Sequence, residues 1–270
     1  MSADSAADRS ADRTAGSSGR ESHIVIAIDG PAASGKSSTA QWVAAELGFR
    51  HVDSGALYRA VTAVALRTGA VVADWTPEWL LEQARHVSLV STEMTLAPCV
   101  DDVSVAAEIR SADVTRFVSF VARVAEVRAW VNAQVRNVAR RHDVVCDGRD
   151  MGTAVFPDAD LKVFLVADPW ERARRRLIQR LGRRPSDEAI AEETDRLVQR
   201  DAADATQTVQ AKDAVLIDTT YLTQSEQVER IVALARATRS RRPLTPWEGI
   251  PSILPPVPPG TPDGRAREVE

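Results

Sequence analysis

A lysine and a hydroxyl residue stand side by side at the end of the run Gly30-Pro-Ala-Ala-Ser-Gly-Lys-Ser37. This spacing is that of the phosphate-binding loop G-x-x-x-x-G-K-[ST], in which backbone N–H groups surround the phosphates of a nucleotide. The Lys36 ammonium can reach β- and γ-phosphate oxygens, and the Ser37 hydroxyl can ligate Mg²⁺. The run therefore predicts nucleotide binding. The expected contact residues are Gly30, Pro31, Ala32, Ala33, Ser34, Gly35, Lys36, Ser37 and Ser38.

A second substrate could bind at the segment Asp53-Ser-Gly-Ala-Leu-Tyr-Arg59. Ser54 can cap a helix there and leave Asp53 just outside it, while Tyr58 and Arg59 lie one turn into the helix. Arg59 could then reach an acceptor phosphate. The alternative is a capping turn whose Arg59 points into solvent.

A third segment, Asp147-Gly-Arg-Asp-Met-Gly-Thr153, places Arg149 and Asp150 between glycines at the end of an apolar run. A guanidinium suits bidentate contact with phosphate, and a carboxylate can accept a hydrogen bond from an exocyclic amine. The alternative is a turn held together by an Arg–Asp pair.

Strands and helices alternate over residues 23–238, which predicts an α/β fold with a parallel sheet covered by helices on both faces. Ligands of such sheets bind at the carboxyl ends of the strands, where the three segments above can converge. Val87–Val105 lacks a helical period and predicts a small antiparallel insert of two or three strands. The expected strands are 24–29, 50–53, 144–146, 161–167 and 215–218; the expected helices are 36–47, 56–68, 111–121, 125–140, 169–179, 187–202 and 225–238.

The remaining sequence separates the classes of P-loop protein. GTPases carry Asn-Lys-x-Asp and Asp-x-x-Gly motifs, and this chain has neither. A motor ATPase usually ends its second phosphate-site strand with an acidic pair, whereas Asp147 is followed by Gly148. A small-molecule kinase fits better, because it needs a second anionic substrate and several arginines to neutralise the phosphates.

Composition sets further limits. The net charge of -4 gives no reason to expect a nucleic-acid polymer as partner, and no apolar run approaches the ~20 residues that span a membrane. Two cysteines in apolar settings, Cys99 and Cys146, are typical of buried thiols in a reducing cytoplasm. We expect residues 1–22 to form a flexible tail. Residues 239–270 hold eight of the fourteen prolines and predict a second disordered tail.

These motifs together resemble bacterial cytidylate kinases, which belong to the P-loop nucleoside monophosphate kinases. The resemblance depends on Ile28-Asp-Gly-Pro31, Asp53–Arg59, Asp147–Thr153 followed by Val155-Phe-Pro-Asp-Ala159, and Asp218-Thr-Thr220. It implies that a monomer transfers phosphate from ATP, with Mg²⁺, to CMP or dCMP. It also implies an acceptor-binding insert at about 70–110 and a lid at about 171–190.

The resemblance further implies roles for individual residues. Ser54 and Asp150 would hold the cytosine, and Ser119 would also face the base. Arg59 and Arg128 would hold the CMP phosphate, with Arg149 beside them, and Tyr58 is a further expected CMP contact. Arg200 would bridge the phosphates, and Asp204 would contact the sugar hydroxyls. The catalytic set would be Lys36, Arg149, Arg175 and Arg200, with Ser37 on the metal and Arg175 also on ATP.

The lid segment carries a basic cluster in which Arg172, Arg176 and Arg180 share one helix face. Some of these arginines should close over ATP. The family pattern is broken at Gln207, where another phosphate-facing arginine is expected, so one charged contact is lost or is supplied by Lys212. Two rival functions stay open. One is a kinase for another acceptor, such as a different nucleoside monophosphate or shikimate; the other is a nucleotide-binding module that has lost phosphoryl transfer.

Overall fold

A computed structural model describes residues 23–92 and 95–239 of this chain. The expected tail at 1–22 lies outside the described residues, as does the expected tail at 239–270 except for Arg239, which ends the last helix. The strands are β1 Val25–Asp29, β2 Arg50–Asp53, β3 Val87–Ser91, β4 Thr95–Val100, β5 Val103–Ser104, β6 Val144–Gly148, β7 Leu161–Val166 and β8 Val215–Asp218. The α-helices are α1 Lys36–Leu47, α2 Ser54–Arg67, α3 Pro77–Ala84, α4 Ala112–Val121, α5 Ala125–Ala139, α6 Pro169–Leu181, α7 Asp187–Asp204 and α8 Gln224–Arg239.

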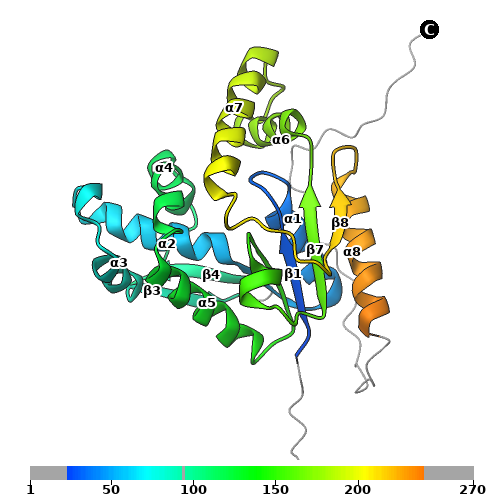
Figure 1. Cartoon of the computed structure of the whole chain (residues 1–270), viewed down its shortest axis with the longest axis horizontal. Helices are drawn as coiled ribbons and strands as arrows, with labels where there is room; N and C mark the ends of the chain where they lie inside the picture. Colours follow the sequence, from blue (N-terminus) through cyan, green and yellow to red (C-terminus); the bar gives the residue numbers. More distant parts are fainter. Residues whose placement is uncertain (1–22, 93–94, 240–270) are drawn as a thin grey trace, which may run out of the picture.

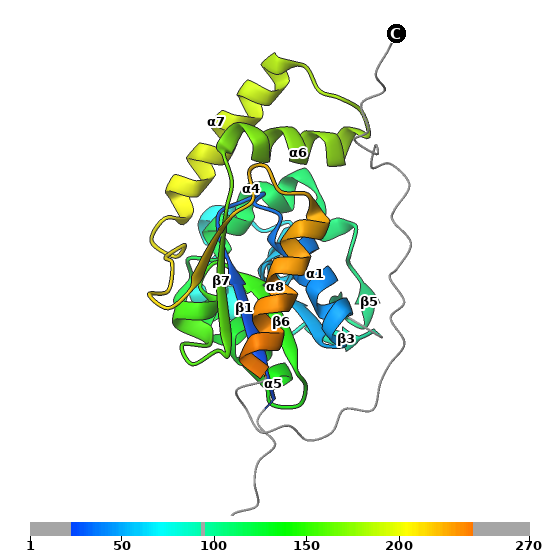
Figure 2. The same cartoon turned by 90° about the vertical axis from the view of Figure 1, so that its right-hand side faces the viewer.

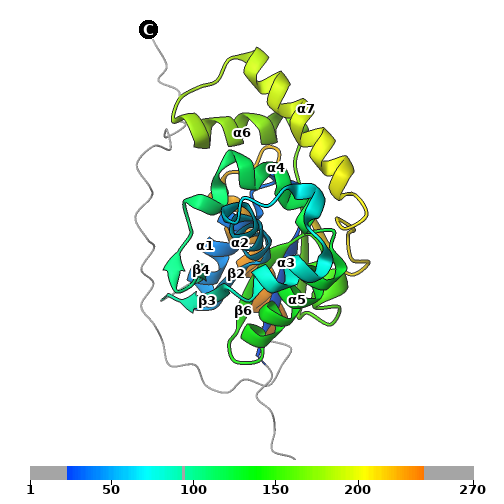
Figure 3. The same ribbon diagram turned by 90° about the vertical axis from the view of Figure 1, so that its left-hand side faces the viewer.

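The strands form one sheet in the order β3-β4-β2-β6-β1-β7-β8, with β5 paired to β4. All the pairs among β4, β2, β6, β1, β7 and β8 are parallel. Helices α1 and α8 cover one face of this sheet and α2, α3 and α5 the other (Figures 2 and 3). The predicted parallel α/β sheet is therefore confirmed.

Alternate residues of β1 explain why both faces are covered. Ile26 and Ile28 point into the cluster that contains Val43 of α1 and Ile231 of α8. Ala27 points into the opposite cluster with α2 and α5. Side chains of a strand alternate between faces, so a central strand that is apolar at every position needs helices on both sides.

The insert forms the expected antiparallel strands, but it is not a separate sheet. β4 pairs antiparallel with β3 and β5, and it also pairs parallel with β2, so the insert extends the main sheet. The sequence analysis did not predict α3. Its start is marked by Thr76, whose hydroxyl accepts from the Trp79 N–H, and by Pro77 at the first helical position.

Helices α6 and α7 pack against each other above the carboxyl ends of the strands (Figure 1). Each has its own start signal. Asp168 caps α6 ahead of Pro169, and Ser186 caps α7. The pair thus forms the roof of the edge at which ligands of parallel sheets bind. None of the helices among residues 23–92 and 95–239 is long and apolar enough to cross a membrane.

Candidate active site

Three neighbouring strands carry an aspartate at their last or second-last residue. The register places Ile28 beside Asp147 and Asp53 beside the same Asp147, so β1, β6 and β2 present Asp29, Asp147 and Asp53 at one edge. Asp29 is buried and accepts from the backbone N–H groups of Met151 and Gly152 at 2.8 and 2.7 Å. These two bonds tie the segment after β6 to the start of the P-loop.

The P-loop itself requires glycine at its first position. Gly30 has φ +148°, and a Cβ there would lie 2.2 Å from the Leu165 carbonyl oxygen. Lys36 is buried and its Nζ donates to the Pro31 carbonyl at 2.7 Å. Burial, followed by the positive charge of Arg149, lowers the pKa of Lys36 to about 7. The buried Ser34 hydroxyl has no hydrogen-bond partner among the described residues, as expected for a loop that a ligand completes.

Ser37 contacts a residue that the sequence analysis left out of the site. Its Oγ donates to Asp147 Oδ2 at 2.6 Å, and Asp147 Oδ1 lies 2.8 Å from Nε2 of buried His51. Burial lowers the pKa of His51, but the hydrogen bond to Asp147 and the charge of that carboxylate outweigh it and raise the pKa. The signal for Asp147 was its place at the end of an apolar strand. The sequence places Asp147 among the residues that can converge at the strand ends, but nothing in it assigns Asp147 a contact with Ser37.

The helix that follows β2 begins differently from our prediction. Asp53, and not Ser54, is the cap of α2: its Oδ1 accepts from the Ala56 N–H at 3.0 Å. Ser54 is the first helical residue and donates to the Asp147 carbonyl at 2.8 Å. This frees Ser54 for close contact with β6, where a Cβ on Gly148 would lie 2.6 Å from its hydroxyl.

A residue predicted to bind cytosine, Asp150, and one predicted to bind the CMP phosphate, Arg128, contact each other just after β6. Arg128 of α5 donates to buried Asp150 Oδ2 and to the Ala122 carbonyl. Burial raises the pKa of Asp150 while Arg128 opposes the rise, and burial raises the pKa of nearby Tyr58 to about 12. The Tyr58 hydroxyl is buried without a hydrogen-bond partner in the described residues. A polar group left in this state marks a place where a ligand would bind.

Arg59 is held in place and does not point freely into solvent. Its Nη1 donates to the Ile109 carbonyl and to the Thr115 hydroxyl, both at 3.0 Å. Burial lowers the pKa of Arg59. The charge of Asp53 acts against this, and the charges of neighbouring arginines lower the pKa further. Thr115 of α4 was not predicted, because a threonine on a helix carries no signal in the sequence until the arginine beside it is known.

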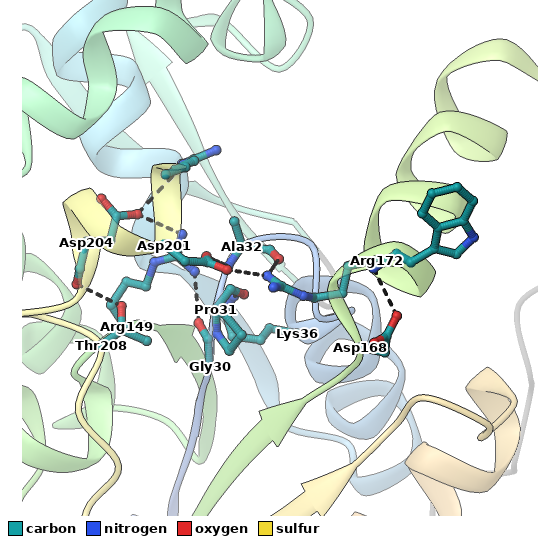
Figure 4. Close-up of polar contacts among 12 residues, drawn as sticks. Gly30, Pro31, Ala32, Lys36, Arg149, Asp168, Arg172, Asp201, Asp204 and Thr208 are labelled. Atoms are coloured by element: carbon teal, nitrogen blue, oxygen red, sulfur yellow. Dashed lines mark hydrogen bonds and ion pairs between the residues drawn. The ribbon is translucent and has the colours of Figure 1, made fainter. Parts of the chain in front are cut away.

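Arg149 connects the acceptor segment to the P-loop and to the roof (Figure 4). Its Nη1 donates to the Gly30 carbonyl at 2.8 Å and its Nη2 to Asp204 Oδ2 at 2.9 Å. Asp204 also lies 3.7 Å from Arg200 Nε. Burial, then the charges of Arg149 and Arg59, lower the pKa of Arg200 to about 10. A turn closed by an Arg149–Asp150 pair, the alternative interpretation, is not what forms.

The lid arginines divide into separate tasks. Arg172 is buried and donates to the Ala32 carbonyl at 2.8 Å and to Asp201 at 2.6 Å, so it fixes α6 to the P-loop and is not available to ATP (Figure 4). Arg175 donates to the carbonyls of Thr219 and Thr220, both at 2.7 Å, at the end of β8. Arg176 reaches Glu193 of α7, with Nε 3.0 Å from Oε1.

The structure thus brings most predicted residues to one edge of the sheet. Contacts described above link Arg149 to the P-loop and to Asp204, Asp204 to Arg200, Arg128 to Asp150, and Ser54 to the Asp147 carbonyl. Tyr58 and Arg59 lie within electrostatic reach of this group. Ser119 is half-buried on α4, and its side chain makes no hydrogen bond within the described residues. Arg175 sits at the β8 end of the edge, away from the Arg149 contacts. Both remain predictions.

The site consists of a P-loop under a two-helix roof and a second set of arginines at the neighbouring strand ends. This arrangement defines the class of P-loop phosphotransferases, which move a phosphoryl group between two anionic substrates. The comparisons narrow this class. The family model described as cytidylate kinase matches residues 26–237. The chain belongs to the cytidylate kinase family, which confirms the expected ATP-dependent phosphorylation of CMP or dCMP.

Individual relatives agree. The chain is 41% identical to cytidylate kinase of Chlorobaculum tepidum, over 78% of this chain and 92% of that protein. It is 41% identical to cytidylate kinase of Streptomyces griseus, over 81% and 95% respectively. A solved shikimate kinase from Bacteroides thetaiotaomicron is 14% identical, covers 79% of this chain and has a TM-score of 0.42. The family assignment therefore rests on the sequence comparisons.

Proposed function

We propose that the protein transfers the γ-phosphate of ATP to CMP or dCMP across the gap between the P-loop and Asp150. The observation that carries this assignment of the site is Arg149, which touches the Gly30 carbonyl on the donor side and stands next to Asp150 on the acceptor side. A single arginine that joins both halves can hold two phosphates in line, and alignment is the main requirement of phosphoryl transfer.

The acceptor would bind among groups that are already fixed. Arg59 and Arg128 are held by carbonyl oxygens and by Thr115 and Asp150, so their guanidinium groups need little reorganisation to meet a phosphate. We propose that Asp150 and Ser54 recognise the cytosine and that Asp204 recognises the sugar. The unpartnered Tyr58 hydroxyl supports a polar ligand at this place.

On the donor side, Ser37 and Asp147 offer a hydroxyl and a carboxylate oxygen in direct contact, which are ligand types that Mg²⁺ prefers. We propose that they hold Mg²⁺ together with ATP. A cation bound there would neutralise charge on the β- and γ-phosphates. Lys36 would bind the same phosphates once it leaves the Pro31 carbonyl. Cys99 and Cys146 are buried free thiols, which fits action in a reducing cytoplasm.

The test is the release of ADP from ATP and Mg²⁺ with CMP, dCMP, UMP, AMP and shikimate as separate acceptors. We expect turnover to favour CMP and dCMP. Asp150→Asn should raise KM for CMP by about 10- to 100-fold and leave KM for ATP within about 2-fold, because one charged contact to the base is lost. The control is Asp158→Asn, an exposed residue shortly after the same segment.

Two results would contradict this proposal. No turnover with any acceptor, in a folded protein that binds ATP, would favour the nucleotide-binding module. The replacement of the expected arginine by Gln207 would then be the first feature to test as the cause. Equal KM values for CMP in the Asp150→Asn and Asp158→Asn variants would remove Asp150 from the acceptor pocket.

A further inference from the structure

A buried carboxylate lies inside the roof with no role in the mechanism described so far. Glu193 of α7 is 3% exposed. Arginines surround it: Arg176 Nε at 3.0 Å, Arg196 Nη1 at 3.4 Å and Arg180 Nη1 at 3.9 Å. Burying a carboxylate is costly unless its charge is paired, so these cations are what allow Glu193 to occupy an interior position. Neighbouring Glu192 is exposed and pairs only on the surface, with Arg196.

Arg176 is the member of this group that lies nearest the site. It follows Arg172 by one helical turn on the same face of α6, and Arg172 touches the Ala32 carbonyl in the P-loop. Arg176 therefore lies one helical turn beyond a residue that contacts the phosphate-binding loop directly. Its positive charge also contributes to the lowered pKa of Arg59 and of Arg200, which places it within electrostatic reach of both sides of the site.

The face of α7 that carries Glu193 leads to the same place. Arg200 and Asp204 follow Glu193 by seven and eleven positions, which is the spacing of one helix face. Asp204 binds Arg149, and Arg149 binds the Gly30 carbonyl. Glu193 is thus the roof end of a row of alternating charges that ends on the P-loop backbone.

The pair also leaves Arg176 capable of binding an anion. Glu193 lies nearest Nε of Arg176, whose side chain is 29% exposed, and within residues 23–92 and 95–239 neither Nη nitrogen of Arg176 makes a hydrogen bond. An arginine held through Nε still presents two parallel N–H groups to a phosphate. Holding one edge of the guanidinium reduces the conformational freedom that it must lose when the other edge binds.

We propose that Glu193 is a positioning residue that holds Arg176 above the phosphoryl group in transfer. The proposal rests on the proposed function of the site. Arg176 would contact the phosphates, and Glu193 would act only through Arg176. It follows that the contribution of Glu193 should vanish when Arg176 is absent.

The experiment is a double-mutant cycle with Glu193→Gln and Arg176→Met, in which kcat and KM are measured with ATP and CMP. We expect Glu193→Gln to lower kcat by about 10-fold with KM for either substrate changed by less than about 3-fold, because orientation and not ground-state binding is lost. Arg176→Met should lower kcat by about 100-fold, the scale for one positioned donor. In the Arg176→Met background, Glu193→Gln should have no further effect.

Glu192→Gln is the matched control, since it removes a carboxylate from the adjacent, exposed position. We expect its kcat within about 2-fold of the wild type. If Glu193→Gln fails to fold, Glu193→Met keeps a side chain of similar volume in the roof and takes its place. A folded Glu193 variant with wild-type kcat, or one whose loss persists unchanged without Arg176, overturns the inference. Failure of the proposed function would appear separately, as no turnover by the wild type.

Discussion

The floor and the roof of this site are stabilised by different interactions. The floor is formed by Asp29, Lys36 and Asp147, which are buried at the strand ends, and by half-buried Ser37; Asp29 and Lys36 are bound to backbone groups. The roof helices α6 and α7 are held to each other by arginine–carboxylate pairs such as Arg172–Asp201 and Arg176–Glu193, and the pair Arg149–Asp204 connects α7 to the segment after β6. Backbone hydrogen bonds fix a shape, whereas ion pairs between helices allow the two surfaces to separate and meet again. A rigid floor under a separable roof suits an enzyme that must admit two substrates and exclude water.

The largest expected effect comes from removing the cation of the floor. Lys36→Met should reduce kcat/KM by about 10³-fold or more, because one charged donor at the transferring phosphate is lost from a buried position. Stability should change little or rise, since the change replaces a buried cation with an apolar side chain of similar length. Steady-state kinetics and urea unfolding measure the two quantities. A variant that loses stability together with activity would show that Lys36 supports the floor and not the chemistry.

The next largest effect should come from the contact between roof and floor. Arg172→Met removes the ion-pair partner of Asp201, which keeps only its hydrogen bond from the Ala32 N–H, and frees the Ala32 carbonyl, so we expect the free energy of unfolding to fall by about 2–3 kcal/mol. Asp201→Asn alone should cost less, because Asp201 is more exposed than Arg172.

The double variant sharpens this prediction. If the two residues act as one clamp, the Arg172→Met/Asp201→Asn protein should be more stable than the sum of the single losses predicts, and urea unfolding would show the difference. Strict additivity would mean that the bond from Arg172 to the Ala32 carbonyl and the bond from the Ala32 N–H to Asp201 contribute independently. Arg174→Met is the control, as its pair with Glu171 lies on the surface of α6.

The same contrast explains what the sequence could predict. Lys36 and Ser37 of the floor were predicted, because the P-loop encodes backbone geometry within a few neighbouring residues, whereas Asp29 and Asp147 were not among the predicted site residues. Where prediction failed, the deciding contact was between distant residues. Asp53 rather than Ser54 caps α2 because Ser54 is occupied by the Asp147 carbonyl, 93 positions away.

The roof shows this limit most clearly. The sequence indicated a basic cluster on α6, but Arg172, Arg175 and Arg176 are assigned to separate partners by residues on α7 and after β8. Arg172 and Asp201 are 29 positions apart, and no local pattern relates them. The helices were predictable from their capping signals and periodicity, whereas the pairing of their charges was not.

The last expected effect, spread over about two pH units, is a pH dependence confined to the floor. Burial raises the pKa of Asp29 to about 6, although the hydrogen bonds from Gly152 and Met151 act against the rise. The folded protein therefore binds this proton more tightly than the unfolded chain, whose carboxyl has the ordinary pKa of 3.8. The stabilisation linked to the proton is present below the unfolded pKa and is lost as pH rises through about 6.

Asp29→Asn, which cannot titrate, isolates this contribution. Between pH ~4 and ~6, the unfolding free energy of the wild type minus that of Asp29→Asn should fall by up to about 1.4 kcal/mol per pH unit and then level off. Asp218→Asn is the control at another strand end: a hydrogen bond from Thr220 lowers the pKa of Asp218, so its difference should stay flat over this range. A flat difference for Asp29 as well would mean that its two N–H hydrogen bonds outweigh burial. Asp29 would then stay ionised throughout this pH range, as the carboxylates of the roof are proposed to be. Floor and roof would differ only in that the floor carboxylate is bound by backbone N–H groups and the roof carboxylates by arginine side chains.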